Sequence, residues 1–194
     1  MLLFSHTKPQ EFPQAILFLD RDGVINEDHG YVHSKENFHF IPGIFELVLA
    51  ARAMGYLCVV VTNQAGIGRG LYTARQFKTL STWMCEQFQN RGAFIDAIYY
   101  SPFHPTEARG RYLLKETTRK PGAGMFLEAA DELNIDLSKS IMVGDKVSDV
   151  KASLKANISS NYLLSSSYIN LDQSLKGKVE IVSDLPAIVS GLQW

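Results

Sequence analysis

The chain has 194 residues, of which 46% are hydrophobic and 20% are charged, and its formal net charge is −1. This balance is typical of a globular protein with a sizeable core, and it argues against sustained binding to nucleic acid or a membrane surface through charge. The two cysteines, Cys58 and Cys85, lie in apolar or helical patterns, and no apolar run resembles a signal peptide or a membrane span, so we expect buried thiols in a cytoplasmic protein.

Alternating apolar runs and helical patterns predict the secondary structure. Residues 1–14 contain two prolines and are expected to form a loose lead-in to a single domain spanning 1–194. The first half of the chain is predicted to form a strand at 15–19, a long connection at about 21–42, a helix at 43–55, a strand at 57–62 and a helix capped by Thr73 and Gln76. A strand at 95–100 and a second long connection at 101–120 follow. The last part is predicted to form a helix at 122–134, a strand at 141–144, a short helix at 148–156, strands at 162–164 and 179–182, and a helix at 185–192.

Strands that alternate with helices predict a Rossmann-like α/β fold, with a parallel sheet and helices on both faces. The two long connections are too short for a large cap domain. Polar residues stand at the ends of three of the strands, because Asp20 and Asp145 follow their strands and Thr62 is the last residue of its strand. Because parallel strands end at the same edge of a sheet, we expect these three side chains to converge in one site.

The residues expected at this edge suit phosphoryl transfer. Asp20 and Asp145 form a hard oxygen site of the kind that Mg²⁺ prefers, while Lys120 and the Thr62 hydroxyl can hold phosphoryl oxygens. We expect Asp20 to attack phosphorus and form an aspartyl-phosphate. Asp22 would protonate the leaving alkoxide and then activate the hydrolytic water.

Four stretches resemble the motifs of the haloacid dehalogenase superfamily of phosphatases, namely Asp20-Arg-Asp-Gly-Val24, Val61-Thr62, Lys120-Pro121 and Gly144-Asp-Lys-Val-Ser-Asp149. The resemblance implies that Asp20 is the nucleophile, Asp22 the acid/base, and Thr62 with Lys120 the phosphate-binding pair. It further implies Mg²⁺ ligands from Asp20, Asp145 and the backbone carbonyl of Asp22. Asp149 matches a second acidic position of the last motif.

Longer stretches, including 26–33, 62–70 and 119–121, resemble the bacterial phosphatases that act on D-glycero-D-manno-heptose 1,7-bisphosphate. The resemblance implies removal of the 7-phosphate by a protein that we expect to be monomeric. It implies recognition of the second phosphate by Arg119, with Lys146 nearby, because a guanidinium can bind phosphate bidentately. The other substrate contacts that it implies are Arg21, Asp28, His29, Gly30, Tyr31, Asn63, Gln64 and Ala65.

The chain departs from these relatives at a zinc-binding loop that many of them carry. The positions of the usual Cys-x-His and Cys-x-Cys ligand pairs hold Ser101, Phe103, Glu116 and Thr118. Structural zinc needs about four Cys or His ligands, so we predict no structural zinc. The loop would then be ordered by packing, with Tyr112 and Leu113 as candidates.

Three alternatives stay open. A histidinol-phosphate phosphatase shares the four motifs, but its cationic substrate fits poorly with the basic segment 109–120. A polynucleotide 3′-phosphatase shares a similar Thr62–Gly70 stretch, but the net charge of −1 gives no basic surface for DNA. A receiver-like signalling domain also combines acidic residues with Thr and Lys, but Asp22 favours turnover over storage of the phosphoryl group.

Overall fold

The computed structural model describes residues 1–5, 15–115, 117–165 and 171–191. These residues form a seven-stranded sheet with the order β1-β4-β3-β2-β5-β6-β7, in which only β1 is antiparallel to its neighbour. The strands are β1 (Leu2–Ser5), β2 (Ile16–Leu19), β3 (Leu57–Asn63), β4 (Ala97–Ser101), β5 (Ile141–Gly144), β6 (Ser160–Leu164) and β7 (Glu180–Val182).

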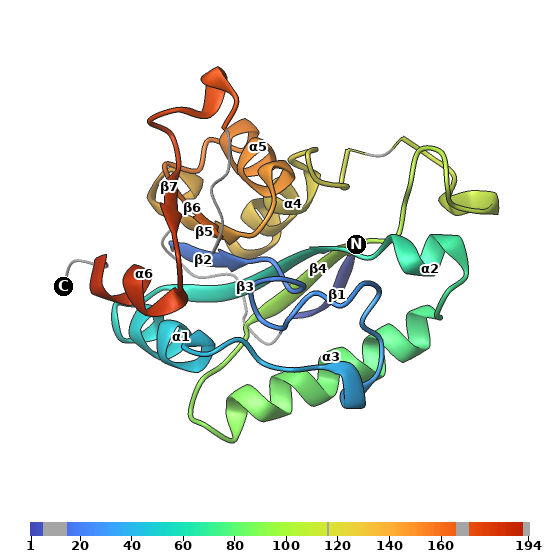
Figure 1. The fold of residues 1–194 in the computed structure, drawn as a ribbon, viewed down its shortest axis with the longest axis horizontal. Helices are drawn as coiled ribbons and strands as arrows, with labels where there is room; N and C mark the ends of the chain where they lie inside the picture. The colour runs from blue at the N-terminus through green and yellow to red at the C-terminus, as the bar shows by residue number, and fades with distance from the viewer. Residues whose placement is uncertain (6–14, 116, 166–170, 192–194) are drawn as a thin grey trace.

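Helices cover both faces of the sheet (Figure 1). Helices α1, α3 and α6 pack on one face, and α4 and α5 pack on the other. The short helix α2 lies beyond the carboxyl end of β3, outside both layers. The bounds are α1 (Ile44–Ala53), α2 (Ala65–Arg69), α3 (Ala74–Gln89), α4 (Gly124–Leu133), α5 (Val147–Lys155) and α6 (Leu185–Gly191).

The alternation of side chains along the strands builds the two halves of the core. In β2, Leu17 and Leu19 pack into the cluster that contains α1, α3 and α6, whereas Ile16 and Phe18 pack toward α4 and α5. All four side chains are fully buried. Because β2 is covered on both sides, it is apolar at every position rather than at every second one.

The strand order explains where the site forms. From β2 the chain adds β3 and β4 on one side, and then crosses back to place β5 on the other side of β2. Ligands of open α/β sheets bind at such a reversal, outside the carboxyl ends of the strands. Asp20 follows β2 and Asp145 follows β5, and the Asp20 N–H donates to Val143 O at 3.0 Å. The predicted convergence at one sheet edge is therefore confirmed.

Two elements differ from the sequence predictions. The expectation that 1–14 is a loose lead-in is wrong for its first part, because Leu2–Ser5 forms β1, with Leu2 opposite Tyr99 of β4. The apolar Leu-Leu-Phe run covers what would be an open sheet edge. The remainder, 6–14, lies outside the described residues. The second difference is α2, which forms within a glycine-rich stretch to which we assigned no helix.

The two long connections hold no inserted domain among their described residues. The first, between β2 and α1, contains one 3-10 turn, Lys35–Asn37, and the second, between β4 and α4, contains another, Gly110–Tyr112. Both lie at the carboxyl edge of the sheet and flank the site. Within the described ranges, no helix has the length and apolar character needed to cross a bilayer.

Candidate active site

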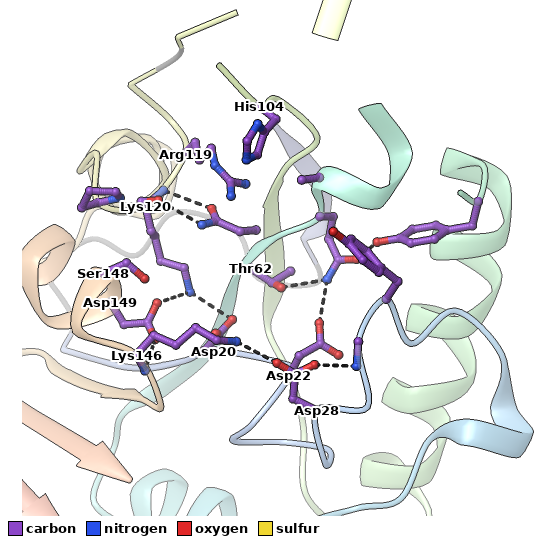
Figure 2. A pocket seen from close by; sticks show the side chains of 17 residues that line it. Asp20, Asp22, Asp28, Thr62, His104, Arg119, Lys120, Lys146, Ser148 and Asp149 are labelled. Atoms are coloured by element: carbon purple, nitrogen blue, oxygen red, sulfur yellow. Dashed lines mark hydrogen bonds and ion pairs between the residues drawn. The ribbon is translucent and has the colours of Figure 1, made fainter. Parts of the chain in front are cut away.

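An acidic centre lies where β2 and β5 end. Asp20 and Asp145 follow these strands, and Asp149 lies in the first turn of α5. Lys120 Nζ reaches into this group, 3.0 Å from Asp20 Oδ1 and 2.9 Å from Asp149 Oδ1, and it donates to Val61 O at 2.8 Å. The Lys120 residue is only 2% exposed. A single buried ammonium is thus shared between a carboxylate at the end of β2 and a carboxylate in the first turn of α5 (Figure 2).

The donor set of this centre fits a divalent cation. Carboxylate oxygens of Asp20, Asp145 and Asp149 lie within 4.8 Å of one another. Oδ1 of Asp145 is buried and has no hydrogen-bond partner among the described residues. Lys120 supplies one buried positive charge to the three carboxylates, and the exposed Lys146, 3.4 Å from Asp145 Oδ2, is shared with Asp28. A cation with a preference for oxygen ligands would balance the negative charge that is left.

Two glycines allow the centre to close. Gly23 has a φ of +94°, and a Cβ at this position would lie 2.3 Å from Oδ2 of Asp145. A Cβ on Gly144 would lie 2.4 Å from Cβ of Asp149. Both approaches are too close for any side chain, so glycine is required for the first connection and α5 to meet at the acidic centre.

Crowding changes the protonation of the centre. Burial raises the pKa of Asp20 to about 7; Lys120 opposes this shift, while the charges of Asp149 and Asp145 add to it. Burial also raises the pKa of Asp145 to about 6. Although burial disfavours the charge of Lys120, the two carboxylates beside it raise its pKa. A proton and a metal ion would therefore compete for the same carboxylates.

Asp22 is held by three side chains next to the centre. Arg21 donates to both of its oxygens at 2.8 Å, Asn26 Nδ2 donates to Oδ1 at 3.1 Å, and Gln64 Nε2 donates to Oδ2 at 3.1 Å. The Arg21 residue is 1% exposed and also donates to Val32 O at 2.7 Å. The buried guanidinium therefore fixes the carboxylate and ties it to the connection that follows.

The residues after Thr62 organise the site from the β3 side. Gln64 Nε2 donates to Thr62 Oγ1 at 2.9 Å, and the Tyr72 hydroxyl donates to the other end of the same amide. Asn63 forms a pair of hydrogen bonds with the backbone of Lys120, each 3.0 Å long. Thr62 is therefore held by Gln64, the residue directly after β3, and the Lys120 backbone is held by Asn63, the last residue of β3.

A cavity of about 580 Å³ opens over this centre (Figure 2). Lys146 and Asp28 lie at its lower side in this view, joined by an ion pair of 2.8 Å, and Arg119 lies at the opposite end beside His104. Although burial lowers it, the pKa of Lys146 is raised by Asp28 and Asp145. Among the described residues, no carboxylate lies within ion-pair distance of Arg119, which donates to Phe103 O at 3.3 Å.

Most of the predicted site residues line this cavity. They are Asp20, Asp22, Asp28, Gly30, Tyr31, Thr62, Asn63, Gln64, Ala65, Arg119, Lys120 and Lys146. Asp145 is not part of the lining but belongs to the acidic centre with Asp20 and Asp149.

Two predicted contacts lie elsewhere. Arg21 is turned into the protein toward Asp22, which corrects its expected contact with substrate. His29 also lies away from the lining, because it pairs with Glu27 at 2.9 Å and packs against His39.

The cavity also contains residues that the sequence analysis did not select, namely Tyr72, His104, Pro121 and Ser148. Tyr72 donates a hydrogen bond to Gln64, a contact that no local sequence pattern indicates. Of the cations in segment 109–120, only Arg119 and Lys120 line the cavity; Arg109, Arg111 and Lys115 are exposed outside it.

The positions that hold zinc ligands in many relatives are filled by other contacts. Thr118 Oγ1 donates to Ser101 Oγ at 3.5 Å, and Phe103 packs against Tyr112 with ring centroids 6.0 Å apart. Glu116 lies outside the described residues. Tyr112 thus contributes packing as expected, whereas the Leu113 side chain is half exposed and joins the loop through a backbone bridge to His104. The absence of structural zinc stays a prediction.

Comparisons with known proteins agree with this geometry. A family model described as HAD-hydrolase-like matches residues 117–185. The chain is 51% identical over 148 residues to D-glycero-alpha-D-manno-heptose-1,7-bisphosphate 7-phosphatase of Burkholderia mallei, covering 76% of this chain and 78% of that protein. It is 44% identical over 180 residues to D-glycero-beta-D-manno-heptose-1,7-bisphosphate 7-phosphatase of Pasteurella multocida, covering 91% and 97%.

Solved structures show the same fold. A HAD-like protein from Mesorhizobium loti superposes with a TM-score of 0.83 at 28% identity, over 96% of this chain and 90% of that one. D,D-heptose 1,7-bisphosphate phosphatase from B. bronchiseptica, complexed with magnesium and phosphate, superposes with a TM-score of 0.78 at 25% identity, over 92% and 98%. The four motifs, the sheet and these relatives lead to one conclusion: the chain belongs to the heptose-1,7-bisphosphate 7-phosphatase family of the haloacid dehalogenase superfamily, a family of phosphoric monoester hydrolases.

Proposed function

We propose that the protein removes the 7-phosphate of D-glycero-D-manno-heptose 1,7-bisphosphate in a Mg²⁺-dependent reaction. The names of its relatives in B. mallei and P. multocida support this activity. So does a cavity that combines a nucleophile, an acid/base and a separate cation. That the protein is a monomer and that it is located in the cytoplasm both stay predictions.

Asp20 and Asp22 divide the chemistry between them. An Asp20 carboxylate oxygen attacks phosphorus and forms an aspartyl-phosphate, while Asp22 gives a proton to the departing C7 oxygen. Asp22 then takes a proton from water, which attacks the same phosphorus and returns Asp20 to its carboxylate form. The hydrogen bonds from Arg21, Asn26 and Gln64 hold the Asp22 carboxylate beside Asp20 for both transfers.

Lys120 and Thr62 hold the transferring phosphoryl group. Their ammonium and hydroxyl lie on the β3 side of Asp20, where they can meet phosphoryl oxygens as charge develops. Asp20, Asp145 and the Asp22 backbone carbonyl would hold Mg²⁺, with Asp149 beside them as the partner of Lys120. When bound, the ion neutralises phosphate charge so that an anionic carboxylate can approach.

Arg119 is the residue that most favours a bisphosphate as the substrate. It lines the cavity at the end away from the Lys146–Asp28 pair, and it keeps its charge without a carboxylate partner among the described residues. Arg119 is half-buried, and this partial burial lowers its pKa, so an anionic ligand would favour its charged form. A planar guanidinium also matches the geometry of a phosphate. A substrate with a second phosphate, several bonds from the reacting one, could bind Arg119 while its reacting phosphate lies at Asp20.

The test is kcat/KM with Mg²⁺ for both anomers of the heptose 1,7-bisphosphate, histidinol phosphate and a 3′-phosphorylated oligonucleotide. We expect the bisphosphate to be preferred, and Arg119→Ala to lower its kcat/KM by about 10- to 100-fold through loss of a charged hydrogen bond. Arg109→Ala is the matched control, because this exposed cation lies in the same connection outside the cavity. Preference for another member of the panel would contradict the proposed substrate.

A further inference from the structure

The second long connection is seated directly on α2. A Cβ on Gly68 would lie 2.3 Å from Pro102 O and 2.9 Å from Tyr112 Cβ. The Arg109 N–H donates to Gly68 O at 2.8 Å. The absence of a side chain at Gly68 therefore allows the connection to pack against the backbone of α2, at a distance that alanine would not permit.

Arg69, the last residue of α2, links the two long connections. Its guanidinium lies over the Tyr31 ring, 5.2 Å from the centroid, and Nη1 donates to the Tyr31 hydroxyl. The same nitrogen lies 3.1 Å from Glu107 Oε2. Tyr31 belongs to the connection after β2 and Glu107 to the connection after β4, so one side chain ties both rims of the cavity to one helix.

The contacts continue from Glu107 to the cavity lining. His104 Nδ1 accepts from the Glu107 N–H at 3.0 Å, and His104 Nε2 lies 3.6 Å from Glu107 Oε2. Arg119 donates to the carbonyl of Phe103, the residue before His104. Displacing Glu107 would thus disturb the turn that sets the positions of His104 and Arg119.

We propose that Arg69 is a positioning residue for substrate selectivity. Through Glu107 it positions Arg119, and through Tyr31 it positions the connection after β2, so that the two sides of the cavity have the spacing that a bisphosphate requires. This inference rests on the proposed function of Arg119. In this chain Ser101, Phe103 and Thr118 stand where many relatives carry zinc ligands, and the contacts with α2 order the connection from outside the loop.

The variants are Arg69→Ala and Gly68→Ala. We expect KM for the bisphosphate to rise about three- to tenfold in Arg69→Ala, the effect of losing one ion pair and one ring contact. The kcat for a hexose monophosphate should stay at the wild-type value, and amide hydrogen exchange should become faster in residues 102–115. Gly68→Ala should give the same pattern by pushing the connection away from α2.

Arg91→Ala is the matched control. Arg91 also stacks on an aromatic ring, 4.4 Å from the Phe45 centroid, and donates to Gln87 O at 2.8 Å, but it lies outside the cavity lining. A charge reversal sharpens the test: Glu107→Arg should reproduce the Arg69→Ala defect, and adding Arg69→Glu should recover part of the selectivity.

Each outcome bears on the inference. An unchanged KM and unchanged exchange in Arg69→Ala would overturn it, as would an equal loss of kcat on both substrates, which indicates a general structural role. If the wild-type enzyme itself shows no preference for the bisphosphate, the proposed function fails. In that case exchange in 102–115 still decides whether α2 holds the connection.

Discussion

Replacement of Asn63 by alanine tests how the structure positions Lys120, the lysine proposed to bind the phosphoryl group. The side-chain amide of Asn63 donates to Lys120 O and accepts from Lys120 N, with both distances 3.0 Å. A hydrogen bond between protein groups contributes about 0.5–1.5 kcal/mol net, so losing the pair should lower the free energy of unfolding by about 1–3 kcal/mol. Because Lys120 Nζ sits between Asp20 and Asp149, a small shift of its backbone should also lower kcat, by about tenfold or more.

The assays are urea unfolding and steady-state kinetics with the bisphosphate. Asn63→Asp keeps the acceptor for the Lys120 N–H but loses the donor, so it should lose at least half of the same free energy. Asn90→Ala, at an exposed position after α3, is the control. The resemblance to relatives implies that Asn63 contacts substrate. A raised KM with unchanged stability and kcat would support that role, and it would refute the role of Asn63 in holding the Lys120 backbone.

Three further changes act on the acidic centre. Burial raises the pKa of Asp20 from 3.8 to about 7 and the pKa of Asp145 from 3.8 to about 6. The folded protein therefore binds a proton at each carboxylate more tightly than the unfolded chain does. The stability that these protons contribute is present below pH 3.8 and is lost as the pH rises through the pKa values of the folded protein. Mg²⁺ needs the charged forms, so its shift of the melting temperature should be larger at about pH 8 than at about pH 5.5, and an equal shift would be inconsistent with the competition. Gly23→Ala places a Cβ 2.3 Å from Asp145 Oδ2 at a φ of +94°, and should abolish the Mg²⁺-dependent shift measured by thermal unfolding. Lys120→Met leaves Asp20 and Asp149 without their buried cation and should cost about 3–5 kcal/mol in urea unfolding without Mg²⁺; a loss below about 1 kcal/mol would contradict the charge balance described here.

The parts of the site that follow from strand ends could be predicted from sequence. The apolar run that becomes β3 is buried along its length, and Thr62 falls at its carboxyl end. Parallel pairing then brings Asp20, Thr62 and Asp145 to one edge, whatever the details of the loops. The positions of these three residues could therefore be predicted, because they depend on the order of the strands and helices and not on single contacts.

The features that sequence did not predict depend on partners far along the chain. β1 forms because Leu2 meets Tyr99, a pairing that no local pattern indicates. Arg21 turns inward because Asp22 and the carbonyl of Val32 accept its hydrogen bonds, so this cation holds the carboxylate proposed as the acid/base. α2 forms in a glycine-rich stretch because its glycines let Tyr72 and the second connection pack against it.

The most direct test of the reaction is ³¹P NMR of the heptose 1,7-bisphosphate with Mg²⁺ and either the wild-type enzyme or Asp20→Asn. We expect the wild-type enzyme to release one equivalent of phosphate and leave the heptose 1-phosphate, and the variant to release none. Turnover that survives in Asp20→Asn would contradict an aspartyl-phosphate on Asp20, and release of the 1-phosphate would contradict the proposed orientation of the substrate between Asp20 and Arg119.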